Sequence, residues 1–419
     1  MVLRFNTGSL WASIAALAMS FLLNGCGGGN GSAADPPVGG LVVTPGAGQV
    51  TITWNAVPGV EYWLVYAAAP SISATPTPKI NHTWAQMVSS PLVIKGLING
   101  VTYSFAMNAR TNGGPGGPST PSVSVIPRPA GGTWTLDRTT PGAQMGDDPM
   151  TAIAYDGNGN FVSVASNGAI YKGTSGANPG IIWTAAPAVP GYSFNALAYR
   201  NFSDGYIAVG AGGYCQGPDL ATPICTPTPG QSWNAVASNG GQAVMVGSNG
   251  NILHSDTVGG PWSAGTGATG DLYGVAYLHN QWFAVGNSGK IFASIDGATW
   301  TAAAVSGASS ASLRAIAHYG DIAIAVGAAG TVLTSADAGL SWKEQPVIAE
   351  APLINAVNVS YDQILVVGNG GKVFISPLSA SPTWTLAADT QTNRDLKALV
   401  GSSSLYFAVG SGGTSIFSQ

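Results

Sequence analysis

The chain has 419 residues, with 14 lysines and arginines against 18 aspartates and glutamates, so its formal net charge is −4. Charged residues make up only 8% of it, compared with about 25% in an ordinary soluble domain. This composition excludes a nucleic-acid partner, which requires a surface rich in lysine and arginine. The 59 glycines and 27 prolines, set among many small and β-branched residues, favour short strands joined by tight turns and predict an all-β fold.

Residues 1–25 are predicted to be a signal peptide. Leu10–Leu23 is a continuous apolar run that has the length of a signal-peptide core and is short for a membrane span. The sequence Leu-Asn-Gly-Cys that follows, ending at Cys26, resembles the lipobox of bacterial lipoproteins. The resemblance implies cleavage before Cys26 and lipidation of its thiol, and Gly27 points to the outer membrane. The alternative is an ordinary signal peptide with an incidental cysteine.

Residues 26–36 are polar and small, which predicts a flexible tether after the lipidated cysteine. We therefore expect a protein of the bacterial cell envelope, anchored by lipid in the outer membrane and either periplasmic or exposed at the surface.

Residues 37–127 predict a β-sandwich, because five short runs alternate apolar and polar residues between turns. These runs are Gln49–Trp54, Glu61–Ala68, Pro91–Leu97, Thr102–Arg110 and Ser122–Pro127. Trp54 on the second run and the spacing from Leu97 to Tyr103 resemble a fibronectin type III domain. The resemblance implies that the Tyr103 hydroxyl bonds back to the backbone, and that the module is a spacer or a protein-binding unit. Residues 128–132 are expected to be a linker.

Residues 133–419 contain a repeat of about 40 residues. Each copy has a strand-like run of the Phe-Ala-Val-Gly type, and the residue at the Val-Gly junction is Ala165, Gly210, Gly247, Gly286, Gly327, Gly368 or Gly410. A sustained period of this length with strand patterning predicts a seven-bladed β-propeller. Each blade is expected to contain an inner strand, the junction strand, a third strand and an outer strand that opens at a tryptophan. Because the chain ends on a third strand, Thr133–Arg138 is expected to close the ring beside Thr414–Ser418.

Ser335–Trp342 and Ser294–Trp300 resemble the Asp-box of sialidases. We interpret the box as a structural turn. Asp337 is expected to accept backbone N–H groups, Gly339 to supply an unusual backbone angle, and Trp342 to pack between blades.

A sialidase-type active site is not predicted. That chemistry requires three arginines, a tyrosine with a glutamate partner, and an aspartic acid. The only arginines and glutamates of residues 133–419 are Arg138, Arg200, Arg314, Arg394, Glu344 and Glu350. The four histidines do not have metal-binding spacing. We therefore expect a non-enzymatic protein without a metal or cofactor.

The blade pattern and the inner strand Leu313–His318 are similar to those of the photosystem II stability/assembly factor-like propellers. In that family the propeller binds other proteins during assembly, which implies a non-enzymatic binding platform here. We expect an anchored binding or assembly-scaffold lipoprotein that takes a protein or glycan partner of the cell envelope. The alternative is a carbohydrate-binding or glycan-cleaving propeller. The oligomeric state stays open.

Cys215 and Cys225 lie ten positions apart in the second blade, and the expected oxidising compartment predicts a disulfide between them. Free thiols or a metal site are weaker alternatives, because no histidine lies nearby.

One position recurs in register along the inner strands and defines the candidate binding face. It is occupied by Thr151, Asn195, Asn234, Gly274, Arg314, Asn355 and Lys397. Because inner strands begin at one mouth of a propeller channel, these residues are expected to form a polar ring there. The side chains either solvate the channel and cap backbone groups, or Arg314 and Lys397 bind an acidic or carboxylate-bearing partner.

Overall fold

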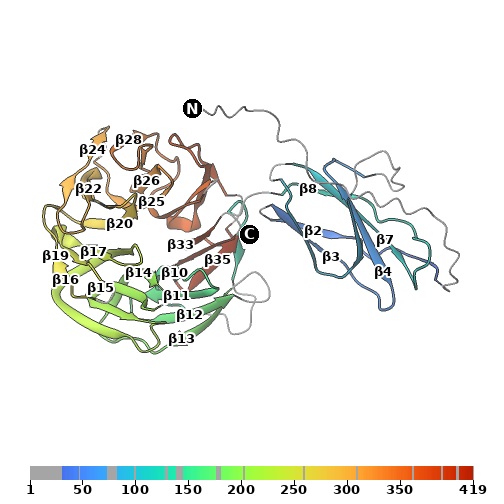
Figure 1. The fold of residues 1–419 in the computed structure, drawn as a ribbon, viewed down its shortest axis with the longest axis horizontal. Coiled ribbons are helices and arrows are strands. Elements are labelled where there is room, and N and C mark those ends of the chain that lie inside the picture. The colour runs from blue at the N-terminus through green and yellow to red at the C-terminus, as the bar shows by residue number, and fades with distance from the viewer. Residues whose placement is uncertain are drawn as a thin grey trace, which may run out of the picture. The chain divides into compact units, whose positions relative to one another are not determined.

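The structure is a computed structural model (Figure 1). It describes residues 31–46, 48–72, 83–98, 101–127, 131–137, 145–175, 181–201, 203–257, 260–307, 310–360, 363–387, 390–402 and 405–418. The expected signal peptide and Cys26 lie outside the described residues. In the part that is described, strands alternate with turns, short 3-10 segments such as Asn287–Gly289 occur, and α-helices are absent, which confirms the all-β prediction. No helix of these residues is long and apolar enough to cross a membrane.

The N-terminal strands form two sheets. One has the order β1 (Ala33–Ala34), β7 (Tyr103–Arg110), β4 (Glu61–Ala67) and β5 (Thr83–Val88), with β8 (Val123–Val125) also on β7. The other has the order β2 (Val42–Gly46), β3 (Gln49–Thr53) and β6 (Leu92–Lys95). The Tyr103 hydroxyl accepts a hydrogen bond from the backbone N–H of Ile98 at 3.2 Å, as expected. Contacts group residues 53–91 and 104–123 in one compact unit, and residues 124–419 with segments 43–52 and 92–103 in another.

The remaining strands form a series of twisted sheets in chain order. One four-stranded sheet holds β10 (Met150–Tyr155), β11 (Asn160–Ala165), β12 (Ile170–Ser175) and β13 (Ile181–Ala186), and a second holds β20 (Leu272–Leu278), β21 (Gln281–Gly286), β22 (Ile291–Ser294) and β23 (Thr301–Ala302). A third holds β29 (Ile354–Val359), β30 (Gln363–Gly368), β31 (Val373–Pro377) and β32 (Thr385–Leu386). The fourth holds β33 (Leu396–Ser402), β34 (Leu405–Gly410), β35 (Thr414–Ser418) and, from the start of this part of the chain, β9 (Thr135–Leu136). Two successive sheets share the long strand β16 (Ile224–Ser238). The first holds β14 (Ser193–Asn201), β15 (Gly205–Gly217) and the first part of β16, and the second holds the last part of β16 with β17 (Ala243–Gly247), β18 (Ile252–Ser255) and β19 (Ser263–Ala264). A five-stranded sheet holds β24 (Ala304–Ser306), β28 (Ser341–Gln345), β27 (Val332–Ser335), β26 (Ile322–Gly327) and β25 (Leu313–Tyr319).

These sheets are arranged around a common axis (Figure 1). The inner strands β10, β14, β16, β20, β25, β29 and β33 each contact the next, and β33 contacts β10. The long strand β16 joins two sheets, because Thr226 pairs with Tyr214 of β15 whereas Val236 pairs with Met245 of β17. The arrangement is that of a β-propeller, with apolar side chains packed between successive sheets.

The strand β9, which precedes the first sheet of the propeller in the chain, closes the ring. Leu136 pairs with Ile416 and Thr135 with Phe417, so β9 is the outer strand beside β35, as predicted; Arg138 lies outside the described residues. Trp134 is 2% exposed and packs into the last core cluster with Tyr406 and Ile416. The strand therefore contributes both ladder hydrogen bonds and core packing.

A buried carboxylic acid follows the closing strand. The Asp137 side chain is 2% exposed, and its Oδ2 accepts hydrogen bonds from Ile181 N at 3.3 Å and Ser415 Oγ at 3.2 Å. Burial outweighs these bonds and raises the pKa of Asp137 to about 6. Asp137 thus connects β9, β35 and β13, where the two ends of the ring meet.

The Asp-box turns have the expected structural role. The carboxylate of Asp337 accepts hydrogen bonds from the Ser341 and Ser335 hydroxyls and from Ser341 N, which lower its pKa. Gly339 has φ +88°, and a Cβ there would lie 2.3 Å from the Phe283 ring. Trp342 is 1% exposed and packs against Phe283 of the preceding sheet. The turn therefore joins neighbouring sheets rather than forming a site.

One outer edge differs from the expected blade pattern. The run after Trp300 was expected to continue as a single outer strand. It forms the short β23 and then β24, which pairs in parallel with β28 of the next sheet, with Val305 opposite Trp342. An exposed strand edge offers unpaired backbone groups to other chains, and β24 covers that edge.

Candidate binding ring at the channel mouth

Each inner strand carries a β-bulge. The register shifts lie between Met150 and Ala152, Phe194 and Ala196, Trp233 and Ala235, Leu272 and Gly274, Leu313 and Ala315, Ile354 and Ala356, and Leu396 and Ala398. At each shift one residue has no partner in the ladder with the neighbouring strand. In chain order these residues are Thr151, Asn195, Asn234, Tyr273, Arg314, Asn355 and Lys397. These same residues line one cavity of about 250 Å³. We call this set the channel ring.

The expected register is wrong at one position. Gly274 pairs with Val285 in the ladder, as Ala315 pairs with Val326, and Tyr273 is the bulged residue that lines the cavity. In every other copy the ring residue is followed by alanine, and Gly274 takes the place of that alanine. The small residue after the ring position is the sequence signal that identifies Tyr273.

Four ring residues connect one sheet to the next. Each side chain donates a hydrogen bond to a backbone carbonyl of the following inner strand. These bonds run from Thr151 Oγ1 to Phe194 O (2.8 Å), from Asn195 Nδ2 to Trp233 O (2.9 Å), from Asn234 Nδ2 to Leu272 O (2.8 Å) and from Asn355 Nδ2 to Leu396 O (2.7 Å). Each acceptor is the carbonyl immediately before the ring residue of the following sheet. In this way the four side chains satisfy backbone carbonyls beside the bulges.

Arg314 has different surroundings. Its guanidinium carbon lies 4.0 Å from the centroid of the Tyr273 ring, and no carboxylate among the described residues forms an ion pair with it. Its Nε is buried and has no hydrogen-bond partner in the described part of the chain. A guanidinium has five N–H donors in a planar fork that matches a carboxylate. Arg314 is therefore a cation with unused donors that faces the cavity.

The charge of Lys397 is already compensated. Its Nζ lies 3.1 Å from Asp395 Oδ2 and 3.2 Å from Asn369 Oδ1. Burial opposes ionisation of Asp395, but the hydrogen bonds from Gly370 N and Lys397 lower its pKa, so it is an anion. Sequence reasoning did not identify Asp395 as a partner of the ring. Because Asp395 compensates the charge of Lys397, Arg314 is the ring residue that attracts an anion most strongly.

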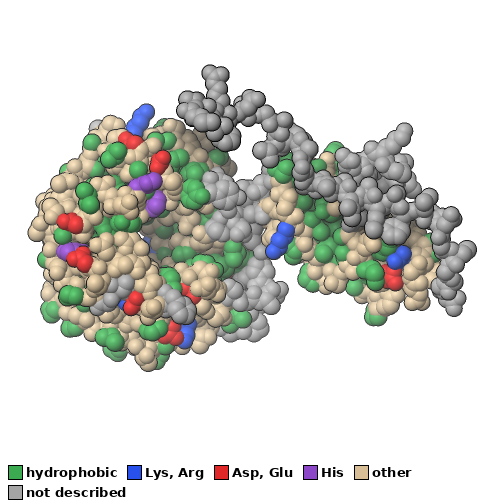
Figure 2. Space-filling model, in the orientation of Figure 1, with side chains coloured by type: hydrophobic (Ala, Val, Ile, Leu, Met, Phe, Trp, Pro, Cys, Tyr) green, Lys and Arg blue, Asp and Glu red, His purple; other side chains and the backbone are tan. Residues whose placement is uncertain are grey.

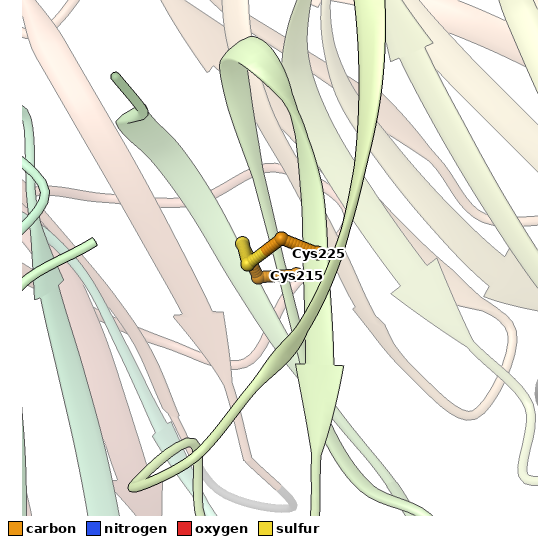
Figure 3. The surroundings of a disulfide bond; sticks show 2 residues. All are labelled: Cys215 and Cys225. Carbon is orange, nitrogen blue, oxygen red and sulfur yellow. A yellow bond between two sulfur atoms is a disulfide. The ribbon is translucent and has the colours of Figure 1, made fainter. Parts of the chain in front are cut away.

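The other expected site residues lie elsewhere. Cys215 and Cys225 face each other across the β15–β16 hairpin and form a disulfide bond, with their Cα atoms 4.0 Å apart (Figure 3). The described residues contain no group of three or more histidine, cysteine, aspartate or glutamate side chains placed to hold a metal ion. Charged side chains are sparse on the face of the molecule that Figure 2 shows.

The fold and the ring define a propeller with a polar channel mouth. No sequence family matches the chain, and no curated protein is similar to it. Solved structures similar to it include a YCF48 bound to a D1 peptide, with a TM-score of 0.53 and 15% identity. They also include the WD40 β-propeller domain of Doa1 (TM-score 0.54, 12% identity) and YCF48 from Cyanidioschyzon merolae (TM-score 0.52, 14% identity). Each match covers 68% of this chain, and 96%, 97% and 98% of the respective solved chains. These likenesses support the propeller fold.

Proposed function

We propose that this protein is a non-enzymatic binding or assembly-scaffold protein that takes a carboxylate-bearing protein partner at the channel ring. The observation that carries the proposal is Arg314, a cation that lies over Tyr273 and whose buried Nε has no hydrogen-bond partner among the described residues. An anion that binds at the ring loses hydrogen bonds to water, and charge-assisted hydrogen bonds from the guanidinium would replace them.

The size of the cavity favours part of a partner over a whole small molecule. Small-molecule sites usually have volumes of about 300–1,000 Å³, and the channel cavity has about 250 Å³. An acidic side chain or the C-terminal carboxylate of a polypeptide suits that space. The YCF48 structure with a bound D1 peptide supports a peptide partner for a propeller of this fold.

The proposal includes a seven-bladed ring. Each inner strand contributes one residue to the cavity, and the repeat period assigns one inner strand to each copy. The N-terminal sheets would serve as a fibronectin type III-like spacer, which the Tyr103 hydroxyl bond to Ile98 N supports. An outer-membrane lipid anchor at Cys26 would keep the ring within reach of envelope proteins. Replacing Cys26 with serine should release the protein to the soluble fraction, and absence of labelled fatty acid on the wild-type chain would contradict the anchor.

The carbohydrate alternative has weaker support at this ring. Stacking of a sugar requires an accessible aromatic face, and the guanidinium of Arg314 covers one face of Tyr273, the aromatic residue among those that line the cavity. The ring thus favours an anionic group over a neutral sugar.

The experiment is an affinity capture from outer-membrane extract with the wild-type chain and the variants Arg314→Ala and Lys397→Ala. We expect Arg314→Ala to lose the partner and Lys397→Ala to retain most of it. Lys290→Ala is the matched control, because Lys290 Nζ bonds to Thr269 Oγ1 at a neighbouring loop and does not line the cavity. Retention of the partner by a normally folded Arg314→Ala protein would dispose of the site.

A further inference from the structure

A second cavity lies between the sheet β10–β13 and the sheet that begins with β14. Its volume is about 340 Å³, which falls in the range of small-molecule sites. Its chemistry comes from Asp156, Asn160, Lys172, Tyr199, Tyr206 and Asp219. None of these residues belongs to the channel ring. We call this space the inter-sheet pocket.

The ring of Tyr199 forms the aromatic part of the wall of the inter-sheet pocket. It is half-buried and packs against Tyr206, with ring centroids 5.1 Å apart and planes tilted by 58°. Tyr206 and Phe161 are only 3% and 4% exposed, so they support the wall from the core and Tyr199 is the ring that a ligand can reach. Aromatic walls of this kind suit the apolar C–H face of a ring-shaped ligand.

An ion pair at the pocket supplies both donors and acceptors. Lys172 Nζ lies 2.7 Å from Asp219 Oδ2, and the two side chains are 41% and 50% exposed. The hydrogen bond from Lys172 lowers the pKa of Asp219 and keeps its carboxylate ionised. A carboxylate accepts about four hydrogen bonds, and Asp219 receives one from Lys172 and one from Ala221 N. Asp219 and Lys172 therefore retain capacity for further partners.

Two further polar groups line the pocket. Asp156 accepts hydrogen bonds from Asn158 N, Asn160 N and Asn160 Nδ2, which fixes the carboxylate in place. The Tyr206 hydroxyl lies 3.4 Å from Asn160 O, at the long end of the hydrogen-bond range. A ligand hydroxyl group could bond to either of these oxygens.

We propose that the inter-sheet pocket binds a neutral pyranose sugar, with its C–H face on the Tyr199 ring and vicinal hydroxyl groups on Lys172 and Asp219. Charge decides against other small ligands. Two carboxylates disfavour an anion, and the ammonium of Lys172 disfavours a cation beside Asp219. A vicinal diol both donates to a carboxylate and accepts from an ammonium, so it fits a pair of opposite charges without displacing it.

The test is saturation-transfer NMR on the full chain with maltotriose, chitotriose and lactose. We expect transfer to the sugar ring protons with at least one of the three. Titration should show at least tenfold weaker binding for Asp219→Asn and for Lys172→Met, because each change removes one member of the ion pair while leaving the aromatic wall.

Asp256→Asn and Arg314→Ala are the controls, and both should bind the sugar as the wild type does. Asp256 is an exposed aspartate near His254, and Arg314 belongs to the channel ring. Absence of transfer with all three sugars, undiminished binding by the Asp219 and Lys172 variants, or binding of choline in place of sugar would overturn the proposal. The Arg314→Ala control also separates this site from the proposed function, since that variant should lose the protein partner and keep the sugar.

Discussion

Arg314 and Tyr273 occupy the same bulge position on neighbouring strands β25 and β20, and the guanidinium carbon lies 4.0 Å from the centroid of the tyrosine ring. The tyrosine holds the guanidinium in one orientation, and the remaining N–H groups of the fork are left for a ligand. In the proposed function this pair is the positioned anion-binding group, whereas Lys397 is held by Asp395.

Tyr273→Leu should weaken binding of the carboxylate-bearing partner about fivefold, because it removes a cation–π contact of about 1 kcal/mol. Tyr273→Phe is the matched variant and should bind as the wild type does, since it retains the ring. Titration of the captured partner measures both. Equal affinity of the leucine and phenylalanine variants would contradict a positioning role for the ring.

Asp137→Asn should stabilise the propeller at neutral pH. The folded pKa of about 6 lies above the ordinary aspartate pKa of 3.8, so the folded state binds more protons between these values and loses stability as pH rises through about 4–6. The cost is fully present above pH 6 and amounts to at most about 3 kcal/mol. Urea unfolding of both proteins at pH 4 and pH 7.5 checks this, because the difference between them should appear mainly at pH 7.5.

Trp134→Ala should destabilise the propeller by about 3–5 kcal/mol, since it removes a buried ring where the chain ends meet. Deletion of residues 133–137 should lower the melting temperature further, because it also removes the ladder with β35. Ile295→Ala is the control, as that side chain is 77% exposed. An unchanged melting temperature after the deletion would argue against closure by β9.

Gly339→Ala should destabilise the fold by more than about 2 kcal/mol. The positive φ alone costs an alanine about 1–2 kcal/mol, and the added Cβ would lie 2.3 Å from the Phe283 ring. Gly320→Ala is a matched control, because Gly320 has φ +54° and open space around a Cβ. Thermal unfolding measures the stability of both variants. Similar losses of stability in the two would show that Gly339 is not required for packing between sheets.

Replacing Cys215 and Cys225 together with serine should cost about 2–3 kcal/mol, the loop-closure entropy of a short loop. The separation of the two cysteines is 10 residues, within one hairpin. Non-reducing mass spectrometry should show the crosslinked peptide in the wild type. Two alkylatable thiols would contradict the bond.

The repeat period was sufficient to predict the strand order because each copy buries the same apolar positions. It predicted the closing strand for the same reason, since an unpaired β35 would leave the last sheet open. The displacement of Tyr273 by one residue could not be predicted from strand alternation, because a bulge interrupts the alternation. The hydrogen bonds of the four ring residues depend on neighbouring sheets, which local sequence does not specify.

The bulge position lies outside the ladder of every inner strand, so its side chain is not part of the alternating core. At four of these positions the side chain donates to a carbonyl of the following inner strand, so a substitution there alters a contact between sheets as well as the lining of the cavity. Tyr273 and Arg314 contact each other instead. A change in ligand preference is therefore expected to arise at Tyr273 or Arg314 more readily than at the four positions that connect the sheets.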